Sequence, residues 1–170
     1  MALRPIKNCF DPVLRKQSEI VKNIDGELVN LSKDMIETTL AAPGIGLAAN
    51  QIGVPWRVFV VNMGVETDTD NLITLINPEI TAMEGSESGE EGCLSIPDVV
   101  VEVNRAIQIE IKAVDLNGKD IRYEASGLLA RALQHEMDHL NGILFWDSLG
   151  KIKRDILKRK FKKKLKEQEE

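Results

Sequence analysis

Residues 133–140 read LQHEMDHL, and the interpretation of the whole chain depends on this stretch. It holds both histidines of the protein, four positions apart, with a glutamate directly after the first. On a helix, residues i and i+4 lie on one face, so two imidazoles can reach one metal ion and the glutamate can reach a water molecule beside it. Ser126 and Gly142 are typical start and stop residues for this helix. The alternative is an amphipathic helix with two surface histidines.

A third metal ligand has to come from elsewhere in the chain, because a catalytic metal site usually has three protein ligands and one open position. His135 and His139 supply two. The chain has no further histidine, and no long helix with glutamates is expected after Gly142, so the third ligands of metzincins and thermolysin-like proteases have no counterpart. Cys93 is the best remaining choice, and a Cys/His/His set suits zinc or ferrous iron. An inert buried thiol is the alternative for Cys93.

The chemistry that such a site favours is amide hydrolysis. A bound metal ion brings the pKa of a water molecule toward neutrality. Glu136, which is not a ligand, would take the proton and pass it to the leaving amine. A tetrahedral oxyanion needs hydrogen-bond donors, and the side-chain amide of Gln51 and a backbone N–H near Cys93 are the available types.

Residues 44–51, GIGLAANQ, form a small, apolar and glycine-rich segment with one long polar side chain at its end. A phosphate-binding loop is disfavoured, because lysine and serine or threonine are missing after the second glycine. Two interpretations remain open. Glycines allow the backbone to approach a ligand closely, or the segment is a simple turn between a helix and a strand.

Hydrophobic periodicity predicts a mixed α and β chain. A helix is expected from the cap Asp25 to about Leu40, because its apolar residues fall at helical spacing. Asn117 and Gly118 form a hairpin signal. The other predicted segments are strands over 57–62, 72–77, 80–83, 99–103, 107–112 and 121–124, a polar loop over 66–71 and an acidic, glycine-rich loop over 84–92.

The length of 170 residues suits a single catalytic domain, residues 1–170, with a real core. No apolar run has the length of a membrane span, and the N-terminus lacks the apolar core of a secretory signal. The two cysteines, Cys9 and Cys93, are too few for a disulfide framework. We therefore expect a cytoplasmic protein without membrane contact, and a monomer because no segment demands a partner.

Charge is distributed unevenly along the chain. Residues 151–170 carry ten Lys and Arg against four Asp and Glu, whereas the other 150 residues carry 12 against 23. A basic C-terminal helix is expected over 148–170, capped by Asp147 and Ser148. Its apolar stripe is formed by Ile152, Ile156, Phe161 and Leu165, with Leu157 beside it. The basic face either binds an anionic partner or is simply solvated.

Three segments in order resemble the signature motifs of peptide deformylase: GIGLAANQ (44–51), EGCLS (91–95) and QHEMDHL (134–140). The start DPVLR (11–15) and the basic terminal helix are similar to the bacterial class with a C-terminal helix. The resemblance covers essentially the whole chain. It implies an α+β fold in which antiparallel or mixed β-sheets pack around a central metal-binding helix, with one N-terminal and one C-terminal helix.

The activity that the resemblance implies is removal of the N-formyl group from N-formylmethionine of newly synthesised polypeptides, with release of formate. The ion would be Fe²⁺, for which Zn²⁺ or Ni²⁺ can substitute. The basic helix would contact the ribosome, where RNA phosphates would explain its charge. The implied metal ligands are Cys93, His135 and His139; the implied catalytic groups are Glu136, Gln51 and the backbone N–H of Leu94.

The resemblance also places the substrate. The peptide would lie as an added strand along Gly44, Ile45 and Gly46, in a β-augmentation. Leu128 and Ala132, with Ile45, would line a methionine pocket. In addition, Glu91 should pair with Arg105 and brace the loop that carries Cys93.

Two positions depart from the family pattern, Gly89 before the cysteine motif and Arg131 on the metal-site helix, where apolar residues are common. Both concern the shape of the side-chain pocket. Two other function classes compete with a deformylase. A general zinc endopeptidase is disfavoured by the cysteine ligand, and a non-catalytic ribosome-binding module is disfavoured by the intact set of catalytic residues.

Overall fold

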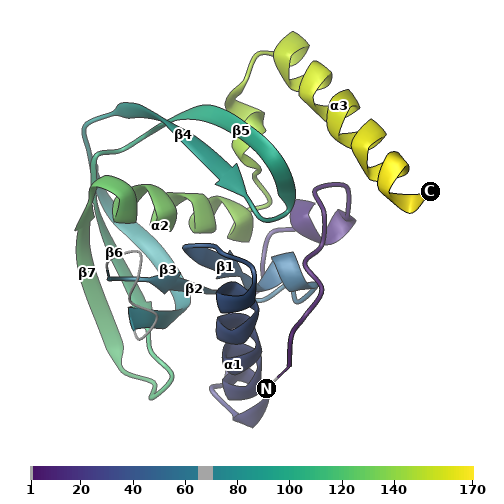
Figure 1. Ribbon diagram of the computed structural model, residues 1–170. Coiled ribbons are helices and arrows are strands. Elements are labelled where there is room, and N and C mark those ends of the chain that lie inside the picture. Colours follow the sequence, from purple (N-terminus) through teal and green to yellow (C-terminus); the bar gives the residue numbers. More distant parts are fainter. Residues whose placement is uncertain (1, 65–70) are drawn as a thin grey trace.

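The computed structural model describes residues 2–64 and 71–170. A five-stranded sheet and a two-stranded hairpin enclose one helix, α2, and Figure 1 shows α2 lying between them. The helices are α1 (Gly26–Ala41), α2 (Gly127–Leu140) and α3 (Lys151–Glu169), and the short 3-10 turns are Pro12–Arg15, Ala49–Ile52 and Phe145–Ser148. The strands are β1 (Gly46–Ala48), β2 (Val58–Asn62), β3 (Leu72–Glu84), β4 (Glu87–Cys93), β5 (Ile96–Arg105), β6 (Gln108–Val114) and β7 (Asp120–Ser126).

The five-stranded sheet has the order β1-β2-β3-β6-β7, and all its pairings are antiparallel. Strand alternation explains which face it buries: Ile109, Ile111 and Ala113 of β6 point into the core against α2, while the residues between them face outward. These observations confirm the expected α+β fold with sheets around a central helix. Among the described residues β1 pairs only with β2, so its other edge is open.

Helix α1 packs its apolar face against β1 and β2 in a second core cluster. It begins at the predicted cap, since the Asp25 carboxylate accepts a hydrogen bond from the backbone N–H of Leu28 at 3.1 Å. It ends just before Pro43, as predicted. None of the helices in the described ranges combines the length and the apolar character needed to cross a membrane.

Strand β3 runs through Pro78 and unites two segments that were predicted separately, 72–77 and 80–83. The register with β6 shifts between Ile76 and Glu79, which marks a bulge. Asn77 sits there with φ of 49°, and its side-chain amide bonds both the N–H and the carbonyl of Val21. The polar loop expected over 66–71 lies outside the described residues except for its last position.

The prediction of a loop over 84–92 was wrong for most of its length. Residues Glu87–Cys93 form β4, which pairs with β5 from Glu87↔Arg105 to Cys93↔Ile96. Acidic and glycine residues disfavour strands on average, but pairing with a partner strand overrides this tendency. The hairpin is essential to the site, because it carries Cys93 above α2.

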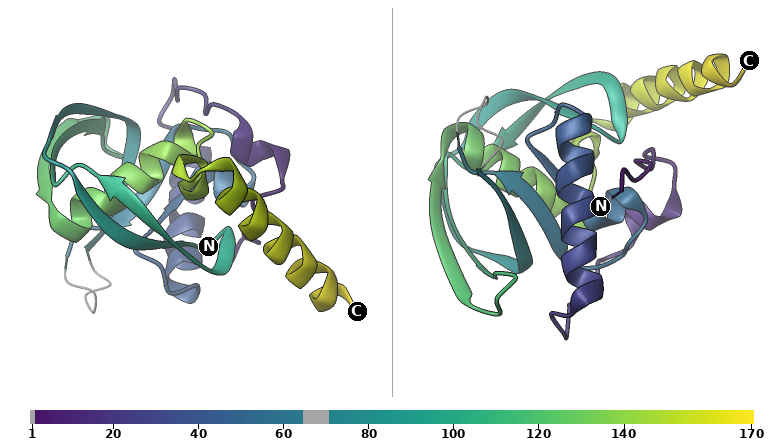
Figure 2. Two further views of the ribbon diagram at one scale, coloured as in Figure 1. Left: turned by 90° about the horizontal axis from the view of Figure 1, so that it is seen from above. Right: turned by 60° about the horizontal axis from the view of Figure 1, so that its bottom comes forward.

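The C-terminal helix begins later than predicted. Asp147 and Ser148 belong to a 3-10 turn, and α3 starts at Lys151 with Gly150 in the cap position. The predicted apolar stripe was half wrong: Ile152 is 79% exposed and Ile156 is 46% exposed. Figure 2 shows α3 extending away from the body in both views.

The face that does dock α3 is made of residues at i, i+4 and i+8. Phe161 is 2% exposed and packs with Leu157 and Leu165 against the third core cluster, which also contains Trp146. Cys9 is buried in the same cluster, where it packs as a small apolar residue. The helix is therefore held by its middle, not by its first turns.

Candidate metal centre

The three potential metal ligands converge although they come from two elements. His135 and His139 lie one turn apart on α2, and Cys93 is the last residue of β4. His139 Nε2 lies 3.1 Å from His135 Nε2 and 3.4 Å from Cys93 Sγ, and all three ligand atoms lie within 4.8 Å of one another. An ion with nitrogen and sulfur ligands at about 2.0–2.3 Å fits between atoms at this spacing. The geometry thus suits a metal with a Cys/His/His ligand set.

The histidines differ in their surroundings. Burial lowers the pKa of His139 and keeps its imidazole neutral, as metal binding requires. Burial also opposes a charge on His135, but its interactions with Cys93 and Glu91 outweigh burial and raise its pKa to about 10. The groups around His135 therefore favour positive charge at this position, and a metal cation on its Nε2 side would supply it.

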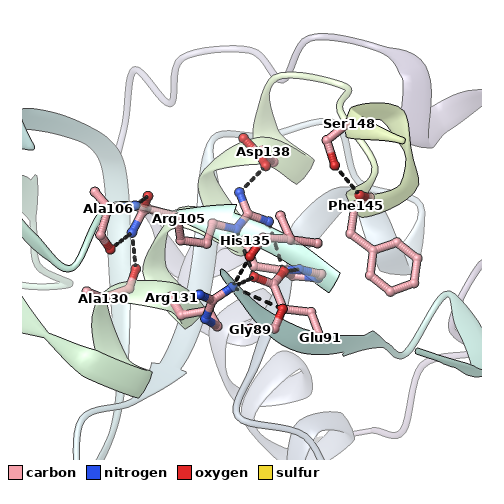
Figure 3. Close-up of polar contacts among 12 residues, drawn as sticks. Gly89, Glu91, Arg105, Ala106, Ala130, Arg131, His135, Asp138, Phe145 and Ser148 are labelled. Atoms are coloured by element: carbon pink, nitrogen blue, oxygen red, sulfur yellow. Dashed lines mark hydrogen bonds and ion pairs between the residues drawn. The ribbon is translucent and has the colours of Figure 1, made fainter. Parts of the chain in front are cut away.

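Glu91 is the hub of a polar network behind the ligands (Figure 3). Its Oε1 is 2.9 Å from His135 Nδ1, and Arg105 donates to both carboxylate oxygens at 2.9 Å. Burial opposes ionisation of Glu91, but the hydrogen bonds from Arg105 and His135 outweigh it and lower its pKa to about 2. A carboxylate on the second ring nitrogen fixes the tautomer that leaves Nε2 free for a metal. The predicted pair of Glu91 with Arg105 is confirmed.

Glu136 stands beside the ligands and makes close contact with the backbone of β1. A Cβ at Gly46 would lie 3.0 Å from Glu136 Oε1 and 3.0 Å from the Val60 carbonyl, so a side chain there would press on both groups. The buried Glu136 Oε2 has no hydrogen-bond partner among the described residues. Burial raises the pKa of this carboxyl to about 7, although nearby positive charge opposes the shift. Such a group can both accept and release a proton near neutral pH.

The Gln51 side chain is fixed in one orientation. Its Oε1 accepts a hydrogen bond from the backbone N–H of Ala48 at 2.9 Å, which turns Nε2 toward the site. Nε2 lies 3.1 Å from Ser95 Oγ and 3.9 Å from Cys93 Sγ. Leu94 follows Cys93 in the turn between β4 and β5. Gln51 and Leu94 both line the cavity that Cys93 and His135 line.

A cavity of about 460 Å³ opens over these groups and gathers nearly all the predicted site residues. Gly44 and Ile45, just before β1, and Gly46, its first residue, line it on one side, and Leu128 and Ala132 line it from α2. The remaining predicted residues on its wall are Gln51, Cys93, Leu94, His135 and Glu136. His139 lies behind this wall and is 1% exposed. Residues 44–46 thus line a cavity, as the close-approach interpretation of 44–51 expects, and the approach to a ligand stays a prediction.

Several supporting residues were not predicted, although they lie within the three motifs. Asn50 Nδ2 donates to the His139 carbonyl at 2.5 Å, and Ser95 Oγ meets Gln51. Asp138 Oδ2 lies 2.5 Å from Arg105 Nη1 and extends the Glu91 network. Each is a polar residue next to a predicted ligand or donor, and that adjacency is the signal that could have identified it.

The family assignment rests on comparisons with known proteins. The family model for polypeptide deformylase matches residues 3–155. The peptide deformylase of Thermodesulfovibrio yellowstonii is 49% identical over 164 residues, which cover 96% of this chain and 99% of that protein. The one from Syntrophobacter fumaroxidans is 48% identical over 167 residues, with 98% of each chain covered.

Solved structures agree with the sequence comparisons. The crystal structure of a peptide deformylase from Legionella pneumophila superposes with a TM-score of 0.92 at 42% identity, and the match covers 98% of both chains. That of the Ehrlichia chaffeensis enzyme in complex with actinonin gives 0.90 at 38% identity, with 96% of this chain and 98% of that chain covered. The chain belongs to the polypeptide deformylase family.

Proposed function

We infer that this chain is a metal-dependent hydrolase that removes the N-formyl group from N-formylmethionine of newly synthesised polypeptides and releases formate. The observation that carries this conclusion is the convergence of Cys93, His135 and His139 beside Glu136, within a cavity on the open edge of β1. Membership of the deformylase family supports the reaction class and the substrate class.

Cys93, His135 and His139 would hold the metal ion, which we propose to be Fe²⁺ with Zn²⁺ or Ni²⁺ as substitutes. A thiolate with two imidazoles suits these borderline ions, which is the basis of the proposal. When bound, the ion activates a water molecule and polarises the formyl carbonyl. The network of Glu91 and Arg105 holds His135 in place from behind.

Glu136 would carry the proton of the reaction. Its carboxylate takes a proton from the attacking water and delivers it to the nitrogen of the leaving amine. The raised pKa and the unpartnered Oε2 support this role, because the carboxyl can change its protonation state near neutral pH without losing a structural bond. The close approach of Gly46 holds the carboxylate against the strand on which the substrate would lie.

Gln51 and the backbone N–H of Leu94 would stabilise the oxyanion that develops on the formyl oxygen. Preorganised donors in a water-excluded site are effective because they need no reorientation during the reaction. The bond from Ala48 to Gln51 Oε1 supports this assignment, since it directs the amide N–H group toward the cavity.

The substrate peptide would add a strand to β1 along Gly44, Ile45 and Gly46. Main-chain hydrogen bonds to an open strand edge supply affinity that does not depend on the side chains of the bound peptide. The methionine side chain would contact Ile45, Leu128 and Ala132, which line the same cavity. Leu128 is 54% exposed and Ile45 is 37% exposed, so both offer apolar surface for a ligand to cover.

We further propose that α3 binds the ribosome and that the protein acts as a cytoplasmic monomer, since its substrate is made there. Ten basic residues in 151–170 would meet RNA phosphates. We expect salt-sensitive binding to ribosomes that is lost when 151–170 is deleted, provided the truncated chain keeps its fold by circular dichroism. Binding that survives the deletion would assign the contact to another surface.

The test of the proposed function is formate release from a short formyl-methionyl peptide, with protein prepared without oxygen and metal content measured on the same sample. We expect release in proportion to bound metal and none after chelation. Casein cleavage under the same conditions would instead indicate a general endopeptidase. A metal-loaded protein that neither releases formate nor cleaves casein would contradict the proposed activity.

A further inference from the structure

Arg131 is a cation buried in the wall of the substrate cavity. It projects from α2 toward the β4–β5 hairpin, and its side chain is 14% exposed. Its Nη1 donates to the Val103 carbonyl at 2.7 Å and lies 2.8 Å from Glu91 Oε2, and its Nη2 donates to the Glu87 carbonyl at 2.9 Å. One guanidinium thus joins the helix to both strands of the hairpin, with its fixed fork of donors used on three acceptors.

Gly89 makes room for this guanidinium. A Cβ at Gly89 would lie 3.0 Å from both Cζ and Nη2 of Arg131 and 3.2 Å from Nε, which is tighter than ordinary contacts. The φ angle of Gly89 is not among the positive ones, so no turn geometry demands glycine at this position in β4. The missing side chain therefore serves the packing of Arg131 (Figure 3).

A short path of contacts leads from Arg131 to two metal ligands. Glu91 Oε2 accepts a hydrogen bond from Arg131, and Glu91 Oε1 is hydrogen-bonded to His135 Nδ1. Arg131 and His135 therefore share one carboxylate. Cys93 lies two residues after Glu91 in β4, the strand that Arg131 clamps. Arg105 also binds Glu91 and reaches α2 through Asp138, and Arg131 adds a second tie, from α2 to both strands of the hairpin.

We propose that Arg131 and Gly89 act as one coupled pair that fixes the β4–β5 hairpin on α2, which makes Arg131 a positioning residue for the metal ligands through Glu91. The proposal rests on the metal-binding part of the proposed function and needs no assumption about the substrate.

The test is a double-mutant cycle with Arg131→Met and Gly89→Ala, measured as the rate of metal transfer from the loaded protein to a chelator. Methionine keeps the length of the stem and removes all the donors. We expect each single variant to release metal about tenfold faster, because loss of groups behind a ligand typically weakens metal binding by this order. The double variant should release metal no faster than Arg131→Met, because the added methyl group no longer meets a guanidinium.

Two control variants test whether loss of any arginine or any glycine would change metal release. Arg122→Met removes an arginine that is 62% exposed on β7, and Gly26→Ala adds a methyl group where nothing lies within 4 Å. Both should release metal at the parent rate. Arg131→Lys serves if the methionine variant does not fold, and it should release metal at an intermediate rate, because one ammonium group cannot serve three acceptors.

Three results would overturn the proposal. Parent-like metal release by Arg131→Met would remove Arg131 from the support of the ligands. Additive effects in the double variant would show that Gly89 and Arg131 act independently. A raised KM with unchanged metal release would make Arg131 a substrate contact instead. Absence of formate release in the parent protein would contradict the proposed activity and would leave the metal-release cycle interpretable.

Discussion

Helices α2 and α3 contrast in how they are held. α2 is enclosed between the sheet and the hairpin, and its polar side chains bond to specific partners, as Gln134 does with both the N–H and the carbonyl of Ala106. α3 touches the body chiefly through Phe161, which is its one buried residue. The difference teaches that the reaction machinery depends on an enclosed scaffold, while the C-terminal helix can lose or change surface residues at little cost.

The largest effect is expected at the centre of α2. Glu136→Ala should keep the metal, because all three ligands remain, and should lower formate release about 10²–10⁴-fold, because the proton carrier is lost. Metal content and turnover are measured on the same sample. Turnover close to that of the parent in a metal-loaded variant would contradict the role assigned to Glu136. It would also contradict the view that α2 carries the reaction machinery.

The enclosed helix was also the part best predicted from sequence. The spacing of His135 and His139 within residues 133–140 fixes both the helical face and the metal chemistry, because one geometry serves fold and function. Cys93 could be chosen as the third ligand only by exclusion and by resemblance. Strand β4, which carries Cys93, was predicted as a loop. Composition gives only the average tendency to form a strand, whereas pairing with β5 determines that these residues form one.

For the C-terminal helix α3, the sequence predicted the helix but not which of its faces is buried. Its amphipathic pattern correctly predicted a helix, and Phe161 and Leu165 of the predicted stripe do pack against the body. Ile152 and Ile156 of that stripe are exposed, and Leu157, predicted beside the stripe, packs instead. A helix so rich in lysine offers several overlapping apolar stripes, and the shape of the surface below it selects one. The same holds for Gly89 and Arg131, whose fit depends on a tertiary contact between a strand and a helix.

The second prediction concerns the anchor of α3. Phe161→Ala should lower the free energy of unfolding by about 3 kcal/mol, since it removes a buried aromatic ring that packs against Trp146 and Phe10. Urea unfolding of the whole chain measures the loss. Formate release by the folded variant should stay unchanged. Lost metal binding in the folded variant would show that α3 supports the site, against the contrast drawn above.

A smaller effect is expected where the chain enters α3. Burial opposes ionisation of Asp147, but bonds from Arg15 and from the Leu144 N–H outweigh it and hold the pKa of its carboxyl below the usual 3.8. A carboxyl group whose pKa is lower in the folded state than in the unfolded state stabilises the fold at pH values above its unfolded pKa. This stabilisation is lost as the pH falls through the folded-state pKa. Asp147→Asn should therefore cost about 1 kcal/mol at neutral pH, a modest value because the pair is partly exposed.

The cost of Asp147→Asn should shrink toward zero as the pH falls through the lowered folded pKa of Asp147, below which the parent carboxyl is protonated as well. Unfolding curves at neutral pH and along an acid series measure it. Asp98→Asn is the matched control, because Asp98 also pairs with a cation but is 70% exposed. A cost for Asp147→Asn that does not change with pH would point to lost packing instead of lost charge.

The smallest effect is expected at Ile152, and it separates the two possible uses of α3. Because this side chain is 79% exposed, Ile152→Ser should change the free energy of unfolding by less than about 0.5 kcal/mol. If the outer face of α3 meets the ribosome, the same variant should weaken ribosome binding while Phe161-dependent stability stays intact. A large loss of stability would mean that the first turn of α3 is buried in solution. Helix α3 would then be enclosed by the body, as α2 is.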